Sequence, residues 1–103
     1  MAIQGYITLT LEAYPEGKAF VSRCRELGVT SCGNSIGSAI EAVTDAVTVY
    51  LRAIEKLGQR ERIFAEKGIE IRKTKPRTVQ TESAPRPPNS FTGNLVVTLP
   101  LAA

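Results

Sequence analysis

The side chains that could act as nucleophiles, bases or zinc ligands are few in this sequence. It contains no His and only two cysteines, Cys24 and Cys32. Without an imidazole there is no Ser-His-Asp or Cys-His triad and no His-ligated zinc site. Two cysteines alone cannot form a tetrahedral zinc site, and neither opens a recognisable helix. We interpret both as packing residues at strand ends; their spacing leaves a disulfide open, which a reducing compartment disfavours.

The acidic residues are the second candidate for chemistry, because metal-dependent nucleases bring several carboxylates onto one or two divalent ions. Glu12 falls in the first expected strand, whereas Glu41, Asp45 and Glu55 fall in the expected long helix. Glu41 and Asp45 lie off the apolar stripe of that helix, so we expect them to face water. The sequence therefore predicts no catalytic, metal-binding or cofactor-binding residue, and a protein that is not an enzyme.

A glycine-containing segment, Gly33-Asn34-Ser35-Ile36-Gly37, precedes the long helix. It lacks the Lys-Ser/Thr of a phosphate loop and the third glycine of a dinucleotide-binding turn. We expect a simple turn with Asn34 or Ser35 as the N-cap. The first helical turn has no Glu, so no capping box is expected.

The elements that position these residues follow from the periodicity of the apolar side chains. Alternation at a period of two predicts strands, and apolar steps of three and four predict helices. Strands are expected over residues 3–13, 18–24, 29–32 and 69–73, a turn over 14–17, and helices over 35–57 and 59–67, ended by Gly58 and Gly68. The fold class is α+β, a two-layer βββα(α)β domain over residues 1–73, with the 69–73 strand able to return parallel to the first.

The end of the sequence departs from this pattern. Residues 74–90 hold four prolines among Thr, Ser and charged residues, and are predicted to be an extended basic linker. Residues 91–103 are predicted to hold one more strand, halted by Pro100. A lone strand leaves its backbone groups unpaired in water, so it must join a sheet edge of its own chain or of another subunit. We favour the second, which makes Leu95, Val96, Val97, Thr98 and Leu99 the candidate oligomerisation residues of a homo-dimer or tetramer.

Charge is unevenly distributed along the chain. Residues 1–71 carry eight Lys or Arg against nine Asp or Glu, whereas residues 72–103 carry five against one. Arg72, Lys73, Lys75 and Arg77 are therefore candidate contacts for nucleic acid, although a solvated linker is the favoured interpretation. No apolar run is long enough to span a membrane and the first residues lack the pattern of a signal peptide, so we expect a cytoplasmic protein.

The run from Tyr14 to Ser35 resembles the HicB-like antitoxin family, which has a hairpin, a C-P-E-L-G-V-x-S-Q-G-D-T stretch and a helix. The stretch is matched by Cys24, Glu26, Leu27, Gly28, Val29, Ser31 and Gly33, and the helix by Ala39, Ile40, Ala46, Val47, Tyr50 and Leu51. The resemblance covers residues 3–73. Departures are Arg25 for Pro, Cys32 for Gln, Asn34 for Asp and Gly37-Ser38 for Glu-Glu.

This resemblance implies a partial ribonuclease-H-like fold without catalytic acids, and a function as an antitoxin that covers the active site of a small HicA-type ribonuclease. Glu12, Glu16 and Glu26 near the hairpin are the candidate partner contacts, because a basic partner favours acidic ones. Residues 91–100 resemble the opening strand of a ribbon-helix-helix module, so we expect a truncated DNA-binding module, which leaves DNA binding open. The alternatives are a stand-alone homo-oligomeric regulator that binds nucleic acid through its basic tail, and a hydrolase with a degenerate ribonuclease-H site.

Overall fold

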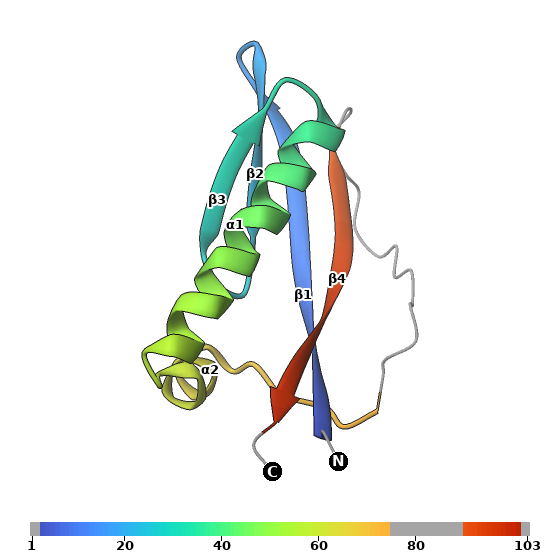
Figure 1. Cartoon of the computed structure of the whole chain (residues 1–103). Coiled ribbons are helices and arrows are strands. Elements are labelled where there is room, and N and C mark those ends of the chain that lie inside the picture. Colours follow the sequence, from blue (N-terminus) through green and yellow to red (C-terminus); the bar gives the residue numbers. More distant parts are fainter. Residues whose placement is uncertain (1–2, 75–89, 102–103) are drawn as a thin grey trace.

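The computed structural model describes residues 3–74 and 90–101 of the 103-residue chain. A four-stranded antiparallel sheet carries two helices (Figure 1). Its strands are β1 (Ile3–Glu16), β2 (Ala19–Cys24), β3 (Val29–Gly33) and β4 (Phe91–Leu101), in the spatial order β3-β2-β1-β4. The helices are α1 (Ile36–Lys56) and α2 (Arg60–Lys67). The predicted α+β class is confirmed.

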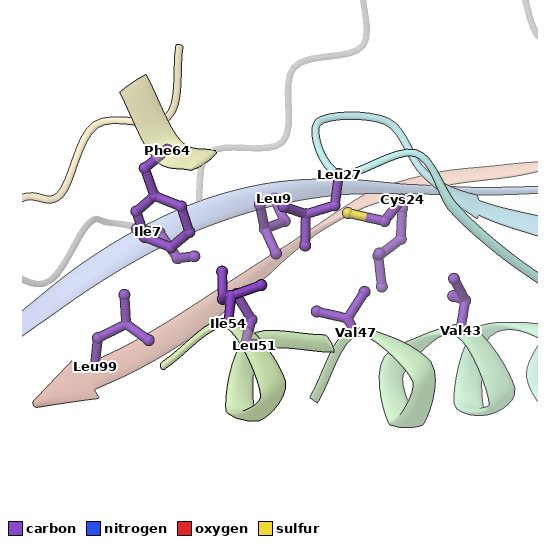
Figure 2. Close-up of a cluster of buried hydrophobic side chains, with 11 residues drawn as sticks. Ile7, Leu9, Cys24, Leu27, Val43, Val47, Leu51, Ile54, Phe64 and Leu99 are labelled. Carbon is purple, nitrogen blue, oxygen red and sulfur yellow. The ribbon is translucent and has the colours of Figure 1, made fainter. Parts of the chain in front are cut away.

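The alternating pattern of β1 determines which face of the sheet is buried. Ile7, Leu9, Leu11 and Ala13 are each at most 4% exposed, and they face α1. The apolar stripe of α1, made by Val43, Val47, Leu51 and Ile54, covers this row and joins it in one core cluster (Figure 2). Burial of such side chains contributes roughly 1.5–3 kcal/mol each, so this layer is the main source of stability.

The β1–β2 hairpin turns later than the sequence indicates. The expected turn at 14–17 lies at Gly17 and Lys18, because Glu16 already pairs with Ala19. Gly17 has a φ of +61°, which favours glycine. Pro15 stays within β1, opposite Phe20. Its nitrogen points toward the β4 side, where pairing has ended at Ala13 and Phe91, so no ladder hydrogen bond is lost.

The start of α1 is capped more completely than expected. Ser35, one of the two predicted candidates, is the N-cap, and its Oγ accepts from the Ser38 N–H at 3.1 Å. The Ser35 N–H donates to Ser38 Oγ at 3.0 Å, which completes a capping box. The expectation of no capping box is therefore wrong, because the short hydroxyl of Ser38 reaches back where a Glu side chain is usual.

Helix α2 and the chain that follows it close the end of the core. Phe64 of α2 is 3% exposed and belongs to the same cluster as Ile7 and Leu99. Gly68 ends α2 with a φ of +68°, as its position predicts. The predicted strand over 69–73 does not form: one antiparallel bridge joins Arg72 to Tyr6. This bridge lies on the side of β1 where β2 pairs further along the strand, and β4 fills the other side of β1.

Strand β4 pairs with β1 of its own chain over eleven residues, from Phe91 opposite Ala13 to Leu101 opposite Ile3. It continues past Pro100, which the sequence suggests as its end. Tyr6 exchanges hydrogen bonds with Arg72 on the side of β1 away from β4. Backbone groups alternate in direction along a strand, so those of Gln4, two residues earlier, also point away from β4. The backbone groups of its partner Pro100 therefore point away from β1. A proline costs nothing there. Within the described ranges no helix is long and apolar enough to cross a membrane.

Candidate binding surface on the open sheet face

The sheet has a second face, which neither helix covers (Figure 1). We call it the open face; the pairing registers and the alternation of side chains place its residues. They are Tyr6, Thr8, Thr10, Glu12 and Tyr14 of β1, Val21 and Arg23 of β2, Thr30 and Cys32 of β3, and Thr92, Asn94, Val96 and Thr98 of β4. Hydroxyl, amide, aromatic and charged groups dominate it.

An ion pair lies near the middle of the open face. Arg25 Nη2 contacts Glu12 Oε2 at 3.1 Å. The side chains are 56% and 26% exposed respectively, so the pair contributes little to stability. The hydrogen bond from Arg25 to Glu12, together with the Glu12 charge, raises the pKa of Arg25, which therefore stays cationic. The pair holds both charges in fixed positions on the surface.

Glu26 makes a different kind of contact, because it replaces a missing strand partner. Its carboxylate accepts from the Thr10 N–H at 2.7 Å and from Thr10 Oγ1 at 2.8 Å. The Arg25 N–H donates to the Thr10 carbonyl at 2.9 Å. Strand β2 ends at Cys24, one position before it could pair with Thr10. Glu26 and Arg25 thus satisfy the backbone of Thr10 and anchor the β2–β3 turn to β1.

The residues that carry the family resemblance build this β2–β3 connection. Cys24 and Leu27 are buried in the core cluster. Gly28 has a φ of +72°, and its N–H donates to the Cys24 carbonyl. At Gly33, a Cβ atom would lie 2.6 Å from the Ala39 nitrogen, so only glycine lets α1 start this close to β3. Each of these residues has a structural role.

The three glutamates predicted as partner contacts do not form one acidic patch. Glu12 is paired with Arg25, and Glu26 is half-buried on Thr10. Glu16 is exposed at the hairpin tip, four residues from Glu12, which is about 13 Å along a strand. Glu16 is thus the most accessible acid of the three, and Glu26 is first a structural residue.

The candidate nucleic-acid residues divide between the described and undescribed parts of the chain. Arg72 and Lys73 are exposed, and Arg72 lies 3.9 Å from Glu70. Since Arg72 is bridged to Tyr6, its side chain extends from the same face as the Tyr6 ring. Lys75 and Arg77 lie outside the described residues, as does nearly all of the predicted linker.

The two cysteines are free and lie on opposite faces of the sheet. Cys24 is buried against α1, and this burial raises the pKa of its thiol. Cys32 is exposed on β3. The disulfide that their spacing leaves open is not formed.

Glu41 and Asp45 are exposed, as predicted, and within residues 3–74 and 90–101 no three His, Cys, Asp or Glu side chains could hold a metal ion together.

The candidate oligomerisation residues divide between the two faces of β4. Leu95, Val97 and Leu99 lie on the helix side, where only Leu99 is fully buried. Val96 and Thr98 lie on the open face. In this single chain β4 pairs with its own β1, and an exchange of β4 between subunits stays a prediction.

Several residues of the open face were not singled out from the sequence. Tyr6, Tyr14 and Arg23 lie on it, and Tyr14 is 41% exposed. The polar half of the β1 alternation was the signal for the two tyrosines, because it predicts which side of the strand meets water.

No protein-family model matches this chain, and neither do curated proteins or solved structures.

Proposed function

We propose that this chain is a non-enzymatic antitoxin of the HicB-like type, which binds a small HicA-type ribonuclease and occludes its active site. The observation that carries the proposal is the β2–β3 connection. Five residues of the C-x-E-L-G-V-x-S-x-G pattern meet a requirement of this turn: Cys24 and Leu27 are buried, Glu26 places its carboxylate on Thr10, and glycines stand at 28 and 33. A match of this kind supports descent from the same fold.

The open face supports a binding role. Its backbone is fixed by pairing on both sides of β1, so its side chains are held in place before a partner arrives. Both signs of charge lie on it or at its margin: Glu12 pairs with Arg25 of the β2–β3 connection, Arg23 is exposed on β2, and Glu16 is exposed at the hairpin tip. Such a mixed pattern favours one oriented partner over non-specific adhesion.

The partial ribonuclease-H-like description is part of this proposal. Three antiparallel strands followed by a covering helix support it. The strand beside β1 differs from the expected parallel return, because it is antiparallel and comes from residues 91–101. We therefore apply the description to β1, β2, β3 and α1.

The test is a binding titration between the purified chain and the HicA-type ribonuclease encoded in the same genome. We expect a Kd below about 1 µM by calorimetry. Glu16→Lys should weaken binding about tenfold, because it reverses an exposed charge beside the open face. Glu41→Lys, which makes the same change on α1, is the matched control and should bind as the wild type does.

Two results count against the proposal. One is the absence of binding to any HicA-type ribonuclease of that genome. The other is retention of nucleic acid, but no protein, when the chain is purified gently from its own cells. The second result would favour the stand-alone regulator, in which Arg72 and Lys73 contact phosphate and binding weakens steeply with salt.

A further inference from the structure

The outer edge of β4 has no strand partner among the described residues. The sheet order places β4 at one end of the sheet and β3 at the other. Alternation turns the N–H and C=O groups of Thr92, Asn94, Val96 and Thr98 away from β1. An edge of this kind is a template for pairing with another strand.

The two edges of the sheet differ in how they are protected. β3 is short, with five residues, and α1 packs over it. β4 has eleven residues in unbroken register with β1, without a bulge. It contains no charged residue, and its one proline, Pro100, is the penultimate residue of the strand. Natural edge strands usually carry a bulge, an edge charge or a central proline, so the bare edge of β4 indicates that something covers it.

The helix side of β4 is also incompletely covered. α1 packs on β3, β2 and β1, and most of β4 lies beside the helix (Figure 1). Phe91 is 37% exposed, and Leu95 and Val97 are only partly buried. A partner strand alongside would bury these side chains further.

We propose that the outer edge of β4 pairs antiparallel with the β4 edge of a second copy, joining two sheets into one of eight strands. An uncharged edge fits a second copy of itself, because no like charges meet across a two-fold axis. Val96 is the central residue of Phe91–Leu101, so a two-fold axis at Val96 overlaps the full length of both strands. The same axis makes Val96 face Val96 of the other copy as a hydrogen-bonded pair, because its backbone groups point outward.

This register satisfies the side chains as well as the backbone. Asn94 meets Thr98 of the second copy on the open face, and Leu95 meets Val97 on the helix side. About eight backbone hydrogen bonds are available, and the missing donor of Pro100 falls in the outermost pair. No charge faces a like charge. An edge of this size is at the low end of specific interfaces, so we expect a Kd in the micromolar range.

The test is disulfide trapping, because it reads the register directly. Two Val96 Cα atoms should lie about 5.5 Å apart, within the range that a disulfide spans. In a Cys32→Ser background, which removes the exposed native thiol, Val96→Cys should give covalent dimers under mild oxidant. Thr92→Cys is the matched control: it lies on the same edge, but its two copies would be about 26 Å apart, so it should give no covalent dimer.

A charge variant tests the same interface without a cross-link. Val96→Lys places two lysines side by side at the axis and should shift the full chain to monomer in sedimentation at micromolar concentration. Thr8→Lys adds the same charge to the same face, opposite Val96 but one strand inside the edge, and should leave the dimer intact. Circular dichroism of both variants is the control that they fold.

Four outcomes would overturn the proposal. The first is a wild-type chain that remains monomeric up to about 200 µM, far above the expected micromolar Kd. The second is disulfide trapping that is as efficient at position 92 as at position 96, which would show that the two strands do not pair in the proposed register. The third is slow exchange of the Val96 amide in the monomer, which would show that another part of the same chain covers the edge. A dimer formed by exchange of β4 onto the partner's β1 gives no trapping at Val96 and also counts against it.

Discussion

Replacing Glu26 separates its structural role from its role as a candidate partner contact. Glu26→Ala removes both hydrogen bonds to Thr10 and leaves a partly buried N–H without an acceptor. A hydrogen bond to a charged group contributes about 1.5–3 kcal/mol, so we expect the free energy of unfolding to fall by about 2 kcal/mol. For a domain of this size that lowers the Tm by about 10 °C.

The assay is urea unfolding followed by circular dichroism, with two comparison variants. Glu26→Gln keeps an amide oxygen for the Thr10 N–H, and should cost about 1 kcal/mol or less. Glu16→Ala removes an exposed carboxylate at the β1–β2 turn, and should change stability by less than about 0.5 kcal/mol. A double-mutant cycle with Thr10→Val isolates the hydroxyl contact. If Glu26→Ala is as stable as Glu16→Ala, the argument that Glu26 anchors the turn is refuted.

Four further predictions concern the core, the start of α1 and the cysteines. Ser22→Ala should stabilise the protein by about 1 kcal/mol in urea unfolding, because the buried Ser22 hydroxyl has no partner among the described residues; a loss of stability would show that it has one. Gly33→Ala should cost about 1–3 kcal/mol in the same assay, since its Cβ would overlap the first turn of α1. A thiol reagent should label Cys32 at once and Cys24 only on unfolding. Equal labelling rates for the two cysteines would contradict this. Because burial raises the pKa of Cys24, its thiol ionises first in the unfolded chain. The stability that the neutral Cys24 thiol contributes should therefore be lost in urea unfolding as pH rises above about 8.5.

Patterns within one element were enough to predict most of the fold. The alternation in β1 and the 3–4 spacing in α1 identify the two surfaces that pack together, and Gly58 and Gly68 end the helices where expected. Both patterns express burial on one face, which is a local property of the sequence.

The errors arose where distant residues decide the structure. Residues 69–73 alternate like a strand that could return parallel to β1, but β4 occupies one side of β1, and on the other side only Arg72 bridges it, in the antiparallel sense. Pro15 was expected in a turn and Pro100 as the end of a strand, but both lie inside strands. The nitrogen of Pro15 points to where β4 has already ended, and that of Pro100 points to the outer edge of β4. The open face is likewise assembled from four strands by pairing register. For that reason, Glu12 and Glu26 could be singled out from the sequence, but not their contacts with Arg25 and Thr10.

The most direct test of the proposed function is inhibition of RNA cleavage by the HicA-type ribonuclease of the same genome. Increasing amounts of this chain are added to a fixed amount of the ribonuclease above the expected Kd, and the remaining rate of cleavage is measured. We predict that the cleavage rate falls linearly and reaches zero when the chain supplies one binding site for each ribonuclease molecule. Glu41→Lys should inhibit as the wild type does, and more Glu16→Lys should be needed for the same inhibition. Full cleavage activity in the presence of a large excess of the folded chain would contradict the proposed function.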